Sequence, residues 1–180
     1  MDHLPKHPYR QPLPGRSAAL SVSKGAIVTA WRALLSARLH THEASKDAAR
    51  SGTRVDGEHR PSNRGERAAV TTQGYLAHAF GERSLALQTS LEQLEAMGLG
   101  PRDEVVIGAV LTLEIDEGAP QIIALLPGGD ATVLDIDGQK VTILSAASPL
   151  ARQLRDAEVE DVLEVEIGPK VSEVYLTSIG

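Results

Sequence analysis

The sequence predicts an α+β protein in which a long helical hairpin precedes a small β domain. Before residue 98, apolar residues recur every three or four positions, which is the period of an amphipathic helix. After residue 101, short β-branched runs alternate with turn residues, which is typical of antiparallel strands. The 180 residues are 42% hydrophobic and 23% charged, so the composition is that of an ordinary globular protein.

Charge is distributed unevenly between the two parts. Residues 1–102 contain 14 Lys/Arg and 9 Asp/Glu, a net charge of +5, whereas residues 103–180 contain 4 and 15, a net charge of −11. Because phosphates repel an acidic surface, the second part is not expected to hold nucleic acid directly. The chain has no cysteine, which excludes thiol catalysis and disulfides. No apolar run reaches the length of a membrane span, so we expect a cytoplasmic protein without membrane contact.

The first 22 residues are expected to form a disordered leader. Four prolines, Pro5, Pro8, Pro12 and Pro14, prevent a regular helix there and remove backbone hydrogen-bond donors. A solvated tail is the favoured interpretation over a recognition peptide.

Residues 23–101 are predicted to form an antiparallel coiled-coil hairpin. The first helix begins near Ser23, its expected N-cap, and continues to Arg50. The second runs from Arg67 to Met97, and a glycine-rich loop over 51–66 joins the two. The expected apolar stripes are Ile27, Trp31, Leu34, Leu35 and Leu39 on the first helix and Leu76, Phe80, Leu87, Leu91 and Leu94 on the second. Trp31 is expected to pack where the hairpin meets the β domain.

Residues 102–180 are predicted to form a small antiparallel β domain with one helix. Strands are expected at 104–114, 121–126, 131–136, 140–144, 163–167 and 171–179. Asp137-Gly138 is a strong hairpin signal, and Gly128-Gly129-Asp130 is expected to be a turn. A short helix fits 149–154, with Ser148 as its cap and proline in its first turn.

Several segments resemble the Gre-type transcript-cleavage factors of bacterial RNA polymerase. The most specific are 141–145 (VTILS) followed by 148–152 (SPLAR), which are similar to the strand, Ser-Pro and helix signature of that family. Residues 161–165 and 107–110 resemble its closing and opening strands. The hairpin segments 44–47, 60–63 and 73–77 resemble a Gre-like subgroup. The resemblance covers about residues 24–180.

The resemblance implies an FKBP-like β domain and an accessory factor rather than a self-contained enzyme. It implies a monomer that docks on bacterial RNA polymerase through Ser148, Pro149, Leu150 and Arg152. The hairpin would enter the secondary channel, near the nascent RNA, and modulate elongation. Acidic residues at the loop would reach the active-site Mg²⁺ of the polymerase and stimulate cleavage of backtracked transcripts, because two-metal hydrolysis needs hard oxygen ligands. No intrinsic cofactor is implied.

The loop departs from the family pattern. Alignment on Asn63 puts the two acidic family positions on His59 and Ser62, and the nearest carboxylates are Asp56, Glu58 and Glu66. Glu66 is expected to act as a helix-start residue, where a carboxylate is favoured by the helix dipole, which leaves Asp56 and Glu58. These two are our candidate catalytic residues. Residues 50–67 contain five arginines against three acidic residues, and such a cationic loop attracts RNA or phosphate. The candidate RNA or polymerase contacts are Arg54, Arg60, Arg64 and Arg67.

Two alternatives remain open from the sequence. A factor of the same shape whose loop does not support cleavage would act as an inhibitor or competitor in the channel. A different class of regulator would bind another protein through the β domain and use the helices to oligomerise. The histidines carry no metal prediction, because His40 and His42 lie two residues apart and face different sides of a helix.

Overall fold

The computed structural model describes residues 22–53 and 64–180. Two long helices, α1 (Lys24–Thr53) and α2 (Arg64–Ala96), are followed by a six-stranded sheet. The strands are β1 (Val110–Ile115), β2 (Gln121–Leu125), β3 (Asp130–Ile136), β4 (Gln139–Leu144), β5 (Val162–Ile167) and β6 (Lys170–Ile179), with α3 (Pro149–Gln153) between β4 and β5. The predicted α+β class, hairpin first and β domain second, is confirmed. The leader 1–21 lies outside the described residues.

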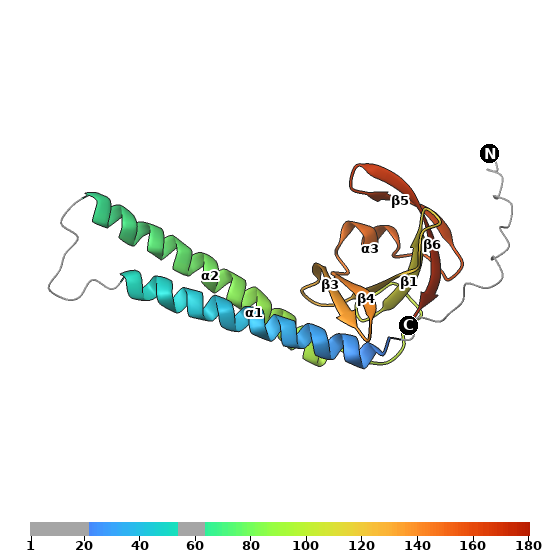
Figure 1. Ribbon diagram of the computed structural model, residues 1–180, viewed down its shortest axis with the longest axis horizontal. Helices are drawn as coiled ribbons and strands as arrows, with labels where there is room; N and C mark the ends of the chain where they lie inside the picture. The colour runs from blue at the N-terminus through green and yellow to red at the C-terminus, as the bar shows by residue number, and fades with distance from the viewer. Residues whose placement is uncertain (1–21, 54–63) are drawn as a thin grey trace.

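The hairpin projects from the β domain as a rod (Figure 1). α1 begins directly after Ser23, whose carbonyl accepts a hydrogen bond from the Ile27 N–H at 3.1 Å. α1 ends three residues later than predicted, and α2 begins three residues earlier. At 1.5 Å per residue, helices of 30 and 33 residues are about 45 and 50 Å long. Among the described residues, no helix is long and apolar enough to cross a bilayer.

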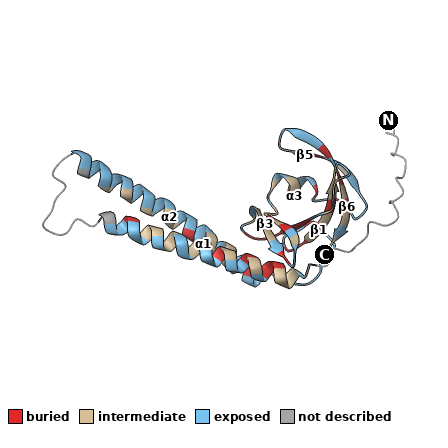
Figure 2. Cartoon of the chain, viewed as in Figure 1, coloured by how far each residue is buried: buried red, intermediate tan, exposed pale blue. Residues whose placement is uncertain are grey.

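The contact between the helices follows a seven-residue repeat whose positions away from the β domain carry fewer large apolar residues. The shielded positions of α2 are Val70, Gln73, Ala77, Phe80, Ser84, Leu87, Leu91 and Leu94. The predicted stripe was therefore wrong at Leu76, which is 43% exposed, because the repeat places Ala77 in the contact. Buried and half-buried positions concentrate at the end of the hairpin nearest the sheet (Figure 2). We infer that packing between the helices weakens toward the loop.

The sheet has the strand order β3-β4-β2-β1-β6-β5. Four of its pairings are antiparallel, as predicted, but β2 and β4 are parallel. The reason is topological: the β3–β4 hairpin folds back so that β4 inserts between β3 and β2 and runs in the direction of β2. Figure 1 shows the sheet curving around α3, with the base of the hairpin against its other face.

Strand β2 is buried on both faces and connects two apolar clusters. Its alternate residues Ile123 and Leu125 join the cluster beneath α3, which also contains Leu154. Ile122 and Ala124 point the other way, into a cluster formed with α1, α2 and β4. That second cluster contains Ile27, Val28, Trp31, Leu35, Leu94, Leu126, Ile136, Val141 and Ile143. The base of the hairpin is therefore a layer of the β domain's core.

The predicted strand over 104–114 was wrong in its first half. Residues 104–109 form turns, in which the Val106 N–H donates to the Glu104 carbonyl and the Ala109 N–H to the Val106 carbonyl. Gly108, with φ of 88°, breaks the extended run and donates its N–H to the Leu125 carbonyl at 2.7 Å. Of the apolar residues in this stretch, Val105 is buried in the cluster beneath α3, whereas Val106 and Ile107 are exposed.

The shared core predicts a stability effect at Trp31. Trp31→Phe should lower the free energy of unfolding by about 1–3 kcal/mol, because the Pro127 carbonyl loses its indole donor inside the core. Trp31→Ala should cost more, about 3–5 kcal/mol. Urea unfolding followed by circular dichroism measures both. Tyr75→Phe, at a position 73% exposed, is the control and should stay within about 0.5 kcal/mol. A Trp31→Phe protein as stable as the unaltered chain would contradict the assignment.

Candidate functional site

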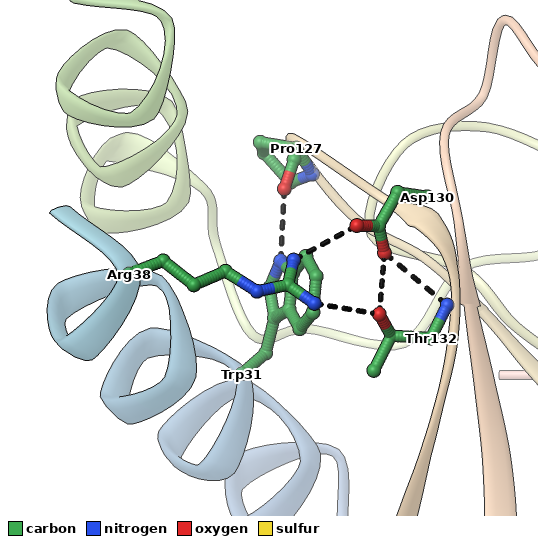
Figure 3. A network of polar contacts seen from close by, with 5 residues as sticks. All are labelled: Trp31, Arg38, Pro127, Asp130 and Thr132. Atoms are coloured by element: carbon green, nitrogen blue, oxygen red, sulfur yellow. Dashed lines mark hydrogen bonds and ion pairs between the residues drawn. The ribbon is translucent and has the colours of Figure 1, made fainter. Parts of the chain in front are cut away.

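A polar joint fixes the hairpin to the β domain. The fully buried Trp31 on α1 donates its Nε1–H to the Pro127 carbonyl at 2.9 Å, two residues after the end of β2 (Figure 3). The predicted position of Trp31, in the core where hairpin and domain meet, is confirmed. Because an indole has a single N–H donor, this bond constrains the position of α1 on the sheet.

Arg38, two turns further along α1, adds a second attachment. Its guanidinium donates to Asp130 Oδ2 at 2.8 Å and to Thr132 Oγ1 at 2.9 Å, and it lies 5.5 Å from the centroid of the Trp31 ring. Thr132 in turn donates its hydroxyl to Asp130 Oδ1 at 2.6 Å and its N–H to the same oxygen at 3.2 Å (Figure 3). Because the guanidinium is planar and donates through two nitrogens, it contacts the start of β3 in one defined orientation.

The electrostatics of Asp130 follow from these contacts. Partial burial opposes ionisation and acts to raise its pKa, but the Thr132 hydrogen bonds and the Arg38 charge together outweigh burial. The net result is a pKa below the ordinary value of an aspartate. The Arg38–Asp130 pair is partly exposed, with 34% and 49% of the two side chains accessible, so solvent screens much of the attraction.

The turn between β2 and β3 requires both of its glycines. A Cβ on Gly129 would lie 2.2 Å from the carbonyl carbon of Leu144, which no side chain tolerates. Gly128 has φ of 70°, and a Cβ there would lie 2.8 Å from the hydroxyl of Ser90 on α2. The predicted turn is confirmed at Gly128-Gly129, whereas Asp130 already begins β3. The turn lies against both helices, because a Cβ on Gly128 would also lie 3.7 Å from Leu35 on α1.

The candidate docking residues lie together on α3, at the other side of the sheet. Ser148 caps this helix: its Oγ accepts the Ala151 N–H at 3.2 Å, and Pro149 occupies the first turn. Leu150 is half-buried and packs against the cluster beneath α3, whereas Pro149 and Arg152 are exposed. The Ser-Pro signature thus has a local structural role as a helix start, and Pro149 and Arg152 provide the accessible surface.

Gln153, at the end of α3, is a residue that the sequence analysis missed. Its side-chain amide donates to the Glu166 carbonyl at 3.1 Å and accepts the Glu166 N–H at 2.8 Å. The amide therefore pairs with the outer edge of β5 as a neighbouring strand would. A lone glutamine in a helix gives no sequence signal for such a contact.

The predicted loop residues separate into two groups. Arg64 and Arg67 are exposed in the first turn of α2, at the end of the rod remote from the sheet (Figure 1). Asp56, Glu58, Arg54 and Arg60 lie outside the described residues. The structure does not bring α3 and the rod end together: they occupy opposite parts of the molecule (Figure 1). Any joint action requires a partner that spans both.

Side chains of the types that can bind metals do not cluster within residues 22–53 and 64–180. No group of three or more His, Asp or Glu side chains there could hold an ion. His42 instead lies in the contact between the helices, with its ring 5.9 Å from that of Phe80. This finding does not extend to the loop that carries Asp56 and Glu58.

Comparison with known proteins gives matches only among solved structures. No protein-family model matches the chain, and no curated protein matches it. The crystal structure of GreA factor homolog 1 (Gfh1) from Thermus thermophilus is 18% identical, with 83% of this chain and 94% of that chain covered and a TM-score of 0.34. Gfh1 from Thermus aquaticus is 17% identical, with 81% and 90% covered and a TM-score of 0.35. The first is named as a homologue of GreA, and the second carries the same name, Gfh1.

The joint predicts a pH-dependent stability. The lowered pKa of Asp130 in the folded chain means that its stabilisation is present above the unfolded value, about 3.9, and is lost as pH falls through the folded value. Asp130→Asn should therefore cost up to about 1 kcal/mol at pH 7, and the difference from the unaltered chain should shrink below about pH 4. Urea unfolding monitored by the fluorescence of Trp31, the single tryptophan, measures it.

Asp47→Asn, an exposed position on α1, is the matched control and should show no such difference at pH 7. A cost at Asp130 that stays constant from pH 7 to pH 2 would contradict the charge-based attachment.

Proposed function

We propose that this chain is a Gre-like accessory factor that binds bacterial RNA polymerase and modulates transcription elongation. The β domain docks on the enzyme, and the hairpin enters the secondary channel. The observation that carries the proposal is the combination of a Gre-type Ser-Pro signature on α3 with a two-helix rod that projects from the same domain. The factor acts through the polymerase's active site and has no active site of its own.

The dimensions of the rod support entry into a channel. Each helix with its side chains is about 10–12 Å wide, so two helices side by side form a body roughly 20 Å across. The longer helix gives this body a reach of about 50 Å. Because the paired faces of α1 and α2 cover each other, the rod is complete without a second copy. This arrangement favours a monomer over the oligomerising regulator.

The charge of the rod end supports contact with RNA or with an acidic channel wall. Arg50, Arg64 and Arg67 are exposed at this end, close to the segment that carries Arg54 and Arg60. Exposed guanidinium groups attract phosphates over about 10 Å at moderate salt. The β domain carries the opposite charge, so phosphate is drawn to the rod end and away from the sheet.

The docking surface predicts a charge-dependent association. Arg152→Glu should weaken binding to core polymerase, and the loss should be larger at low salt, because Arg152 is exposed beside the Ser-Pro helix start. Anisotropy of the labelled full chain titrated with polymerase measures it. Arg32→Glu, exposed on α1, is the control. If the control loses affinity and Arg152→Glu does not, docking occurs elsewhere.

The loop carboxylates decide whether the factor stimulates cleavage. Asp56 and Glu58 are two residues apart, so their oxygens can converge on one ion, and Mg²⁺ supplied by the polymerase prefers such hard ligands. Asp56→Asn with Glu58→Gln should abolish cleavage of a backtracked transcript while leaving polymerase binding intact, because charge is removed with little change of shape. Arg60→Gln with Arg64→Gln should instead weaken binding, most at low salt.

The matched control removes two charges elsewhere, by Asp47→Asn with Glu82→Gln, and should cleave normally. If the unaltered protein gives no cleavage at any Mg²⁺ concentration yet blocks an authentic cleavage factor, the chain is an inhibitor in the channel. If cleavage occurs and survives the double carboxylate substitution, other residues carry it.

A further inference from the structure

An open groove lies on the β domain between the start of that domain and the segment after α3. One wall is formed by Asp103, Glu104 and Val106, and the other by residues 155–159. The groove has a volume of about 690 Å³. Val106 and Val159 contribute apolar surface to it and are 37% and 47% exposed.

Both walls of the groove are anchored to the core of the β domain. Val105 and Ala157, one in each wall, are buried in the same apolar cluster beneath α3. Asp161 accepts the Glu158 N–H at 2.8 Å, and its carbonyl accepts the Leu176 N–H of β6 at 3.0 Å. The second wall is thereby fixed to the sheet.

The rim of the groove is acidic. Its charged residues are one cation, Arg155, and four carboxylates, which give the rim a net charge of −3: Asp103, Glu104, Asp156 and Glu158. All five side chains are exposed. Exposed carboxylates beside the apolar side chains of Val106 and Val159 suit a segment that combines basic and apolar side chains, and they repel nucleic acid.

The first 21 residues of the chain have the complementary composition. They contain Lys6, Arg10 and Arg16 against Asp2, a net charge of +2. Tyr9 and Leu13 lie between the basic residues, and Leu4 precedes the first of them. Proline fixes its own φ, so a proline-rich segment loses less conformational entropy on docking than an ordinary one.

The place where this leader joins the described chain lies next to the groove. Lys24, at the first turn of α1, donates its Nζ–H to the Gly100 carbonyl at 2.7 Å, and burial followed by the charge of Arg102 lowers its pKa. Gly100 precedes Asp103 by three residues, a span of at most about 10 Å. A leader of 21 residues can extend roughly 70 Å, so the groove is well within its reach.

We propose that residues 1–21 dock in this groove within the same chain, with their basic residues on the acidic rim and their apolar residues on Val106 and Val159. The sequence alone favours a solvated tail for the leader. The acidic groove beside its attachment point favours docking instead. Tethering gives the leader an effective concentration in the millimolar range, so weak exposed ion pairs suffice to hold it. The inference is independent of the proposed function.

Paramagnetic labelling of the full chain tests the proposal. The chain has no cysteine, so Gln11→Cys gives one nitroxide site in the leader. At low salt the label should cause loss of amide signal at Asp103–Val106 and at Arg155–Val159. In about 1 M salt, where the Debye length is about 3 Å, the signals should return. Signal loss in a mixture of labelled and isotopically enriched chains would instead identify a second copy as the occupant.

Charge reversal supplies the matched comparison. Glu104→Lys with Glu158→Lys should abolish the signal loss in the groove, and further exchange of Arg10 and Arg16 for glutamate should restore it. Glu82→Lys with Glu92→Lys, at exposed positions of α2, should leave it unchanged. Signal loss elsewhere, no loss at all, or a loss indifferent to the groove substitutions would overturn the proposal.

Discussion

The burial of both faces of β2 is the constraint on which the rest of the structure depends. A curved sheet with one short helix can cover only one of its faces, and here α3 covers the face that carries Ile123 and Leu125. The opposite face, with Ile122 and Ala124, would be exposed apolar surface without the base of the hairpin. The helical hairpin and the β domain differ in composition, but they pack together because the second face of the sheet must be removed from water.

This arrangement divides the hairpin into two regions with different physical character. Near the sheet, Trp31 and Leu35 are fully buried, and Arg38 adds a directional polar contact. Further out, the contact between helices uses small or polar residues such as Ser45, Ala77 and Gln73, which bury little apolar area. Free energy of packing is thus concentrated at the joint. The base of the hairpin therefore fixes the direction of the rod. The outer part, which is less tightly packed, is expected to open locally at a lower free-energy cost.

Much of the fold could be predicted from local patterns, because helix periodicity, turn residues and β-branched runs are local signals. The errors arose where tertiary contacts decide. In the apolar run at 105–107 only Val105 enters the core, and Gly108 then turns the chain, so no strand forms. The parallel pairing of β2 with β4 depends on which strand the β3–β4 hairpin inserts against, and nothing local encodes that choice.

The candidate site was predictable only in part, for the same physical reason. The Ser148 cap is a short-range motif, and the structure has it as expected. Arg38 and Asp130 are 92 residues apart, and Gln153 meets a strand edge by its backbone, so neither contact leaves a spacing in the sequence. Asp56 and Glu58 were chosen for their charge and loop position, and their assignment stays a prediction.

The common core has a consequence for attempts to dissect the molecule. Linker 98–101 is the natural point for a protease or a designed break, since it lies between α2 and the β domain and is exposed. Severing it would not yield two independent domains, because the clusters around Trp31 and Ile143 would still hold the fragments together. Each fragment produced alone would display half of an apolar interface and would tend to self-associate. The hairpin and the β domain are therefore one folding unit. We expect fragments cut at the linker to complement each other, and we do not expect either part to be exchangeable as an independent domain.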